Sequence, residues 1–521
     1  MLSQLSCSRG ALAGSRQLVA RLAGARQQQA RHHRLAAASA VSQAEQQQPA
    51  PAAEPAEQPQ AEAGKAAGGK AARKVGAAGP AAPGAKGMID TSPPRGTRDF
   101  YPEEMRLRNW LFGEMEAVAQ LFGFEQFDVP VLESEELFVR KAGEEITDQL
   151  YNFQDKGGRR VALRPEITPS LARLVLGKGK GLALPQKWWI IGQCWRYERM
   201  TRGRRREHYQ WNMDVIGVTG VEAEAELLAA IVAFFERLGL TPADVGLKVS
   251  SRKVLAAVLE RYAVPRANFA QVCVVVDKLE KLPRDKVEEE LAALGVAADA
   301  IDGARAAAAG AAPQRPRAGG ARGAGAAAHG GDALADLRRL WALAEGYGFQ
   351  EWLVFDASVV RGLAYYTGVV FEGFDRAGAL RAICGGGRYD ALLGTFGGED
   401  VPCAGFGFGD AVIVELLKDR GLLPAPAQQV DDVVLVMDEA LRPAACGVAA
   451  RLRAAGRRVD LVLELKKLKW AFKQAERAGA ARLLLVGGEE WGRGAVAVRD
   501  LAARTQAEVP VAELVPGGGA S

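Results

Sequence analysis

Apolar residues along this chain recur at helix spacing in some segments and at strand spacing in others, beginning near residue 88. A helix is expected after "TRDFYPEEM", where Pro102 stands in the first turn and two glutamates follow at the positive end of the helix dipole. Its expected apolar face consists of Trp110, Met115, Val118, Leu121 and Phe122. The next apolar stretch, "FEQFDVPVLE", predicts a strand that Pro130 interrupts.

Two β-rich segments, 186–198 and 208–218, flank a short charged stretch and predict a long hairpin. A helix over 222–240 follows and is expected to end at Gly239. Residues 346–424 predict two strands around an Arg-Gly turn, then a strand and glycine turn, then a strand running into a helix. We therefore expect one α+β domain in two parts, 88–251 and 346–424.

The segment between those two parts, 252–345, has several helical patterns and is expected to be a helical insertion. Within it, residues 303–331 are almost entirely Ala, Gly, Arg and Pro, a composition that predicts disorder. After a short linker, "VVLVMD", "VDLVLE" and "RLLLVGG" predict buried strands separated by helices. Residues 430–515 are therefore expected to form a separate α/β domain.

The first 87 residues have a different composition. Residues 1–44 contain six arginines and no acidic residue, which is typical of an organellar transit peptide, although a generic basic tail would have the same composition. Residues 46–87 are mostly Ala, Pro, Gly and Gln and predict a disordered linker. Without the leader arginines the net charge falls from +5 to −1, so any site for a polyanion must be local. The chain has no apolar run long enough for a transmembrane helix.

Cysteine and histidine usage narrows the chemistry. The six cysteines include no CxxC pair, and two of the four histidines lie in the leader, so no zinc cluster is expected. Reduced structural thiols are the simplest interpretation. A Ser/His/Asp or Cys/His catalytic site is disfavoured as well, because His208 is the only histidine in a strongly patterned region.

The charged stretch inside the hairpin, "WRYERMTRGRRREHYQ", holds six arginines between Arg196 and Arg206. It could be a disordered tag, a solvated hairpin tip, a nucleic-acid patch or a cradle for a small polyanion. Arg196 and Glu198 are two residues apart, hence on one face of a strand, and Gln210 and Asp214 share a face of the return strand. Polar groups on one face of an apolar hairpin favour a lined pocket, and guanidinium forks suit phosphate.

Three further segments carry candidate ligands. "LRPEITPSLARL" contains Glu166 and Thr168, which could bind an ammonium group or cap a helix. "RGLAYYTG" contains Arg361 and two adjacent tyrosines, of which only one would face a pocket on a regular strand. "GGGRYD" permits close backbone approach to a ligand, although triple glycine alone indicates only a turn. Neither a GxxxxGK[ST] loop nor a strand–GxGxxG–helix unit is present.

Taken together, residues 94–514 resemble the histidyl-tRNA synthetase family of class II aminoacyl-tRNA synthetases. "FDVPVLE" is similar to the first class signature, "RPEITPSLAR" to the amino-acid-binding segment, and the arginine-rich hairpin to the second signature. "DASVVRGLAYYTGVVFE" is similar to the stretch diagnostic of the histidine enzyme. The resemblance implies an α+β catalytic domain with an antiparallel sheet, the class II synthetase fold, followed by a C-terminal α/β anticodon-binding domain.

The activity implied is activation of histidine with ATP to histidyl-adenylate, followed by transfer to the 3′ end of tRNA(His). ATP would be used as its Mg²⁺ complex, and no zinc is implied. Formation of the adenylate would be an in-line displacement at the α-phosphate. Such a reaction needs positioning and charge neutralisation more than a side-chain base. The family pattern makes Arg196 and Arg361 the catalytic residues. It assigns ATP binding to Arg196, Glu198, Arg204, His208 and Arg361, and histidine binding to Glu166, Thr168, Arg196, Gln210, Asp214, Tyr365, Tyr366 and Tyr389.

Three positions depart from the family pattern. The third signature usually has an arginine early in the helix after its glycine-rich strand, but Asp410, Ala411 and Val412 stand there. The γ-phosphate must then be held by Arg204 or a neighbouring loop arginine, or be held more weakly. Ala364 replaces an acid before the tyrosine pair, and His208 replaces the aromatic residue that stacks on adenine. The missing arginine makes the chain similar to plant-type organellar members.

The resemblance also implies a homodimer, formed through the helix and strand of the first signature. The leader, as a transit peptide, predicts a location in the chloroplast, the mitochondrion or both. No membrane partner is implied. Two alternatives remain open: a catalytically inactive regulatory paralogue of the same fold, and an RNA-binding protein that uses only the basic loop. The residues 431–521 contain 14 Lys and Arg against 12 Asp and Glu, so charge alone gives weak support for RNA binding.

Overall fold

The computed structural model describes most of the chain after residue 89. The described ranges are 90–142, 144–261, 284–296, 326–356, 365–424 and 430–515, together with Val264, Pro265, Asn268, Gln271, Val272, Val275 and Val359. The leader and linker expected over 1–87 lie outside these ranges, as do Arg361, Ala364 and most of the low-complexity stretch 303–331.

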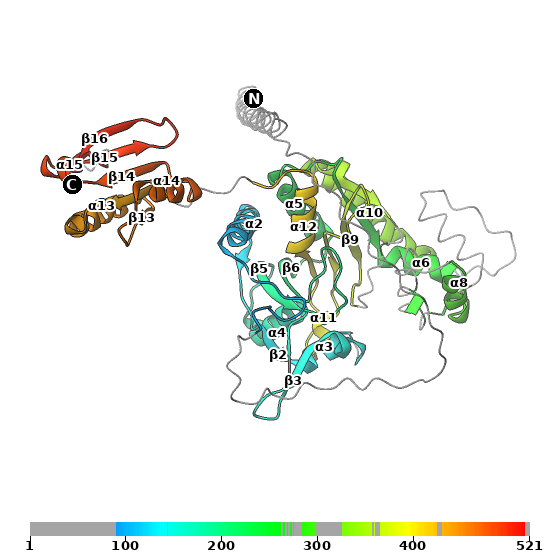
Figure 1. The fold of residues 1–521 in the computed structure, drawn as a ribbon. Helices are drawn as coiled ribbons and strands as arrows, with labels where there is room; N and C mark the ends of the chain where they lie inside the picture. The colour runs from blue at the N-terminus through cyan, green and yellow to red at the C-terminus, as the bar shows by residue number, and fades with distance from the viewer. Residues whose placement is uncertain are drawn as a thin grey trace, which may run out of the picture. The chain divides into compact units, whose positions relative to one another are not determined.

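An eight-stranded sheet forms the centre of the first domain, with strand order β1-β5-β6-β11-β10-β9-β7-β8 (Figure 1). Its strands are β1 (Glu125–Gln126), β5 (Gln186–Trp195), β6 (Glu207–Ile216), β7 (Val245–Ser251), β8 (Leu353–Phe355), β9 (Val369–Asp375), β10 (Cys384–Arg388) and β11 (Cys403–Gly409). The six strands from β5 to β7 pair antiparallel, as expected. The short edge strands β1 and β8 pair parallel to their neighbours, so the complete sheet is mixed.

The hairpin of β5 and β6 is confirmed, with Gln186 opposite Ile216 and Trp195 opposite Glu207. One face of the sheet packs into the main hydrophobic core through Trp211 and Met213 of β6 and the phenylalanines of β11. Because side chains alternate along a strand, the residues between them face the other side. The second face is therefore free to carry polar groups.

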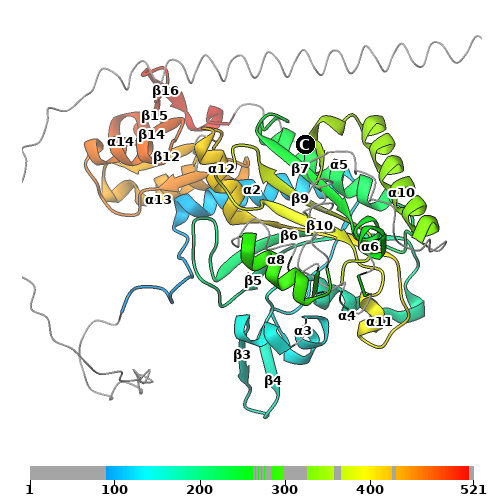
Figure 2. The ribbon, with the colours of Figure 1, turned by 90° about the vertical axis from the view of Figure 1, so that its right-hand side faces the viewer.

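Helices α2 (Pro102–Leu121), α5 (Glu222–Arg237) and α12 (Asp410–Asp419) cover the core face (Figures 1 and 2). The face expected for α2 is partly wrong. Leu111, Met115, Val118 and Ala119 are buried, whereas Leu121 is 71% exposed. Leu121 is the last residue of the helix, so the apolar pattern of the sequence continues past the buried part of the helix.

The other face of the first domain carries smaller elements. Helix α4 (Thr168–Lys178) and the short α11 (Leu392–Thr395) pack there, next to α3 (Glu135–Ala142). A three-stranded sheet, β2 (Leu132–Ser134), β4 (Arg160–Leu163) and β3 (Tyr151–Gln154), forms the arm at the bottom of Figure 2. The interruption expected at Pro130 is confirmed, because β1 and β2 lie on either side of it in different sheets.

The insertion contains α6 (Arg252–Arg261), α8 (Arg284–Ala293) and α10 (Ala326–Tyr347). Helix α10 packs against α5 and α6 and begins inside the stretch 303–331 that was expected to be disordered. Residues 326–331 are therefore a correction to that boundary. The reason is that alanine, which dominates the start of this helix, has the highest intrinsic helix propensity.

Residues 430–515 form an α/β domain with a five-stranded sheet of order β13-β12-β14-β15-β16. Its strands are β12 (Asp432–Val436), β13 (Val459–Leu461), β14 (Arg482–Val486), β15 (Ala495–Asp500) and β16 (Gln506–Pro510). Its helices are α13 (Arg442–Ala454), α14 (Leu468–Arg477) and α15 (Gly488–Gly492). Separate hydrophobic clusters cover the two faces of the sheet, because the parallel strands are buried on both sides. No helix among the described residues is long and apolar enough to span a membrane.

Candidate active site

The face of the large sheet opposite the main core carries a polar floor bordered by glycines. His208, Gln210, Asn212 and Asp214 alternate along β6 with its core residues. On β11, Gly405 lies opposite Asp214 and Gly409 lies opposite Gln210. A Cβ atom at Gly405 would lie 1.8 Å from Asp214 Oδ1, and one at Gly407 would lie 2.1 Å from Gln210 Nε2. The alternating glycines of "GFGFG" therefore leave the space in which these polar side chains lie.

Glu166 and Lys141 form a buried ion pair at one end of this face. Lys141 Nζ lies 2.7 Å from Glu166 Oε2 and 3.8 Å from the centre of the Tyr365 ring. Burial by itself would raise the pKa of Glu166, but the positive charges of Lys141 and Arg196 lower it below its ordinary value. Thr168, also buried, begins α4 two residues further on. An ionised carboxylate is thus held next to the polar floor.

Asp214 is the least compensated carboxyl group of the site. The Tyr389 hydroxyl donates to Asp214 Oδ1 at 2.5 Å, while Oδ2 is buried and has no partner among the described residues. Burial raises the pKa of Asp214 to about 7, although the Tyr389 hydrogen bond and the Lys141 charge oppose the rise. An unpartnered oxygen in a buried site is costly unless a ligand donates to it.

The paired tyrosines correct one expectation. Tyr365 and Tyr366 lie in a turn before β9 rather than on a strand, so alternation does not separate them. Their ring centres are 4.6 Å apart, and that of Tyr365 is 6.0 Å from that of Tyr389. All three tyrosines pack in one cluster with Leu171 of α4. They form an aromatic wall beside Asp214 and Lys141.

The arginine-rich loop follows the same floor beyond the end of β5. Arg196 and Glu198 lie in this loop and not on the strand, which corrects the argument from strand alternation. The Arg196 amide nevertheless donates to the Arg206 carbonyl at 2.8 Å, and its Nε donates to the Pro165 carbonyl at 3.0 Å. The hairpin pairing thus continues one step past the strand and orients the Arg196 guanidinium.

Glu198 and His208 lie among positive charges at this end. Arg204 Nε donates to Glu198 Oε2, and this bond lowers the pKa of Glu198 against the opposing effect of burial. Burial, with the charge of Arg196, lowers the pKa of His208 to about 3. The imidazole is therefore neutral at physiological pH and presents an uncharged ring, which suits stacking on a base.

The structure brings most of the sequence-predicted residues to this one face. Glu166, Thr168, Arg196, Glu198, Arg204, His208, Gln210, Asp214, Tyr365, Tyr366 and Tyr389 lie on its floor, its aromatic wall or the adjoining loop. Arg361 lies outside the described residues, so its position stays a prediction.

Two arginines of the candidate motifs have structural contacts instead. Arg388 of "GGGRYD" is buried and forms a two-pronged ion pair with Glu224 at 2.6 and 2.8 Å. Arg164 is likewise buried and donates to the backbone carbonyls of Val129 and Gln193. Both guanidiniums join separate segments around the site and do not face it.

Sequence reasoning missed two cations, Lys141 and Arg381. Lys141 follows Phe138 by three residues on α3, a spacing that puts both on the buried face of the helix, and this was the available signal. Arg381 lies in the turn between β9 and β10, and the charges of Arg204 and Arg196 contribute to lowering its pKa after burial itself. The sequence carried only an indirect signal for Arg381: the third-signature arginine is missing, so another cation was needed.

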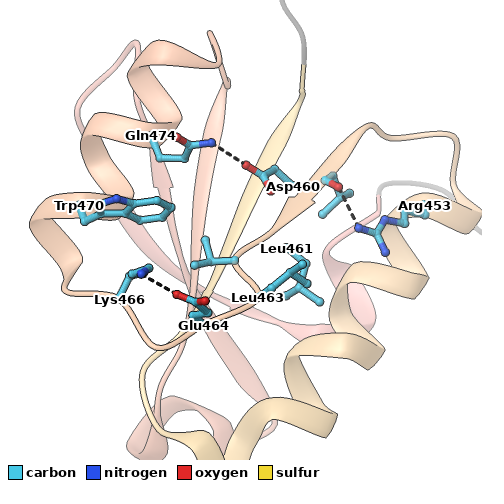
Figure 3. Close-up of a pocket in the computed structure, with 10 residues that line it drawn as sticks. Arg453, Asp460, Leu461, Leu463, Glu464, Lys466, Trp470 and Gln474 are labelled. Carbon is cyan, nitrogen blue, oxygen red and sulfur yellow. Dashed lines mark hydrogen bonds and ion pairs between the residues drawn. The ribbon is translucent and has the colours of Figure 1, made fainter. Parts of the chain in front are cut away.

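The C-terminal domain has its own hollow of about 420 Å³ (Figure 3). Trp470 of α14, Leu461 of β13 and the Leu463–Lys466 loop line it. Leu463 is 81% exposed, and Lys466 Nζ lies 5.8 Å from the centre of the Trp470 ring. An exposed aromatic ring beside lysines is a common surface for an unpaired base.

The fold and the arginine-lined face together define a class II aminoacyl-tRNA synthetase. The family model "Histidyl-tRNA synthetase" matches residues 96–410, and the model "Anticodon binding domain" matches residues 431–517. The chain belongs to the histidyl-tRNA synthetase family.

Individual relatives agree with this assignment. The chain is 59% identical to "Histidine--tRNA ligase, chloroplastic/mitochondrial" of Arabidopsis thaliana over 82% of its length and 86% of that protein. It is 39% identical to "Histidine--tRNA ligase" of Opitutus terrae over 80% of its length and 95% of that protein.

Solved structures share the fold. Histidyl-tRNA synthetase from Nostoc sp. PCC 7120 superposes with a TM-score of 0.66 at 25% identity, covering 82% of this chain and 98% of that one. A protein described as ATP phosphoribosyltransferase regulatory subunit/histidyl-tRNA synthetase from Bacillus halodurans C has a TM-score of 0.61 at 24% identity, covering 78% and 100%. The fold alone therefore does not separate the ligase from the regulatory alternative.

Among the described residues, no group of three or more His, Cys, Asp and Glu side chains is placed to hold a metal ion. Cys194, Cys384 and Cys403 are buried thiols, and Cys446 is exposed.

Proposed function

We propose that this protein is a histidine–tRNA ligase that forms histidyl-adenylate from histidine and ATP and transfers the histidyl group to tRNA(His). The observation that carries the proposal is the order of groups on one face of the sheet. The Glu166–Lys141 pair, Asp214 and the tyrosines stand at one end, and the arginine loop stands at the other. This order matches an amino acid joined to a nucleotide, and the family membership supports it.

Each end of the face suits one substrate. Asp214 Oδ2, which has no partner among the described residues, would accept the imidazole N–H, with Tyr389 fixing the carboxyl group. Glu166 would receive the substrate ammonium group, with Thr168 and Gln210 beside it. The aromatic wall of Tyr365, Tyr366 and Tyr389 would exclude water from the ring. A site that hydrogen-bonds a polar ring rejects apolar analogues strongly, so no editing step is needed.

The arginine loop would hold ATP, taken as its Mg²⁺ complex. The charge of Arg196 lowers the pKa of both Glu166 and Glu198, so Arg196 would bridge the histidine carboxylate and the α-phosphate. Glu198 would accept from the adenine amino group, and the neutral His208 ring would stack on the base. Arg204 would contact the outer phosphates, and the family pattern gives Arg361 the charge that develops at the α-phosphate.

The reaction follows from this placement. A carboxylate oxygen of histidine attacks the α-phosphorus, a new P–O bond forms, and the bond to the β-phosphate oxygen breaks to release pyrophosphate. The negative charge only redistributes among oxygens, so guanidiniums placed beforehand can stabilise the transition state. In the second step the 3′-terminal ribose hydroxyl of tRNA attacks the carbonyl carbon of histidyl-adenylate. A new ester C–O bond forms, the C–O bond to AMP breaks, and the hydroxyl proton is released with AMP.

The C-terminal domain would bind the anticodon loop of tRNA(His). The hollow beside Trp470 supports this, because Leu463 and Trp470 expose apolar surface next to Lys466 (Figure 3). A homodimer is supported by exposed apolar residues in the first signature, where Leu121, Val131 and Leu132 reach solvent. The acid-free leader supports import into chloroplasts, mitochondria or both.

Histidine-dependent exchange of pyrophosphate into ATP tests the proposal on protein lacking the first 87 residues. Exchange with histidine, and none with other amino acids, is the expected result. A folded protein without exchange would favour the regulatory alternative. RNA binding that ignores histidine and ATP, without exchange, would favour the plain RNA-binding alternative.

A further inference from the structure

The start of α12 offers no cation of its own. The third-signature arginine of the family would stand at Val412, which is buried in the main core and packs against Gly203 of the arginine loop. Asp410 of the same turn is also buried. Its Oδ1 accepts from the Tyr209 amide at 3.0 Å, and its Oδ2 pairs with Arg98. The Asp410 carboxylate therefore neutralises Arg98, the cation that contacts this turn. Another segment must then hold the outer phosphates of ATP.

The turn between β9 and β10 reaches the same edge of the sheet. The Gly409 amide, at the last residue before α12, donates to the Ile383 carbonyl at 3.4 Å. Gly409 also lies opposite Gln210 of β6, two residues after His208. The ends of β6 and β11 and the start of β10 thus converge, and Arg381 stands two residues before Ile383. The arginine loop rises from this edge as well, because it connects β5 to β6.

Arg381 is exposed, and the charges of site residues act on its guanidinium. Its side chain reaches solvent and makes no hydrogen bond or ion pair with any residue in the described ranges. Charges of Arg204, Glu198 and Arg196 act on its guanidinium, and the Arg381 charge acts in turn on His208. Three guanidiniums share this end, and two acidic groups oppose them: Glu198, which pairs with Arg204, and Glu372, whose charge acts on Arg381. Such an excess of positive charge is stabilised when a polyanion binds.

We propose that Arg381 holds the outer phosphates of ATP together with Arg204, at the place where the family uses an arginine of the third signature. This inference rests on the proposed ligase function. It also places the phosphate-binding cation on a different element. In this chain the arginine comes from the turn between β9 and β10, whereas the family pattern places it at the start of the helix that corresponds to α12. Val412 is buried beneath Gly203 of the arginine loop, so this position of the helix contributes no charge to the site.

The test measures binding of ATP and of AMP to the wild-type protein and to Arg381→Ala, Arg381→Lys and Arg205→Ala. AMP lacks the outer phosphates, so it reports on the adenine and α-phosphate contacts alone. Arg381→Ala should weaken ATP binding about ten- to a hundredfold, the usual effect of losing a charge-assisted hydrogen bond. AMP binding should stay unchanged, and Arg381→Lys should keep part of the ATP affinity.

Arg205→Ala is the matched control, because it removes an exposed positive charge from the arginine-rich loop and leaves the turn between β9 and β10 intact. It should leave ATP affinity close to wild type. The proposal is overturned if Arg381→Ala leaves ATP binding unchanged, or weakens AMP as much as ATP, or if Arg205→Ala has an equal effect. Histidine-dependent exchange by the wild-type protein separates this result from the proposed function. If exchange is absent, the ligase proposal fails, while the comparison of ATP with AMP still decides the role of Arg381.

Discussion

Replacing Asp214 by asparagine should stabilise the protein at alkaline pH and weaken its binding of histidine. Asp214 is 1% exposed, and burial raises its pKa from 3.8 to about 7. The folded state therefore keeps a proton that the unfolded chain has lost between these two pH values. The free energy of unfolding therefore falls as pH rises from about 4 to about 7. Above pH 7 the folded protein bears the full cost of a buried, ionised Asp214. A shift of about 3 units corresponds to at most about 4 kcal/mol.

Asparagine cannot ionise, so the variant avoids this cost while its Oδ1 can still accept from the Tyr389 hydroxyl. Thermal unfolding of the ligand-free protein at pH 5 and pH 8.5 measures the difference. The variant should gain several degrees over wild type at pH 8.5, and the gain should shrink at pH 5. The KM for histidine in the exchange assay should rise about ten- to a hundredfold, because a charge-assisted bond to the imidazole is lost.

Tyr389→Phe is the companion variant. Its missing hydroxyl removes the hydrogen bond that lowers the pKa of Asp214, so histidine binding should need a higher pH than in wild type. The reasoning is refuted if Asp214→Asn is no more stable than wild type at pH 8.5, or if its stability difference is the same at both pH values.

Three further variants test other parts of the site. Arg361→Ala should abolish histidine-dependent exchange, while size-exclusion chromatography should show an unchanged oligomer. Full activity of this variant would contradict the role assigned to Arg361 at the α-phosphate. Gly405→Ala would place a Cβ 1.8 Å from Asp214 Oδ1, so it should raise the KM for histidine at least tenfold, whereas an unchanged KM would show that the floor adapts. Trp470→Ala should raise the KM for tRNA about tenfold and leave exchange intact, because one stacked base contributes about 1–3 kcal/mol. A loss of exchange in that variant would contradict the separation of the two domains' roles.

The fold was largely predictable because its elements have strong local signals. The hairpin of 186–198 and 208–218 and the strands of 430–515 have clear strand patterns, and Pro130 marks a real break between sheets. Two features were not predictable. Leu121 fits the apolar periodicity of its helix but is not packed, and residues 326–331 are helical despite their low-complexity composition, because alanine has a high helix propensity.

The site was predictable where polar residues alternate on a strand. Gln210 and Asp214 share a face of β6, as their spacing indicates. The spacing argument failed for Arg196 and for the two tyrosines, because those residues lie in a loop and a turn. Lys141 and Arg381 come from segments that look ordinary in sequence, and only the tertiary arrangement brings them to the site.

The Lys141–Glu166 ion pair would bias which small molecules bind at the proposed histidine site. Glu166 is already neutralised by a built-in cation, and Arg196 adds a further positive charge nearby. An incoming amine without a carboxylate, such as histamine, would add a cation beside Lys141 and Arg196, whose charges are opposed by Glu166 and, once ionised, by Asp214. Histidine carries its own counter-charge as a zwitterion and would add no net charge. The proposed site would thus disfavour decarboxylated analogues before ATP binds.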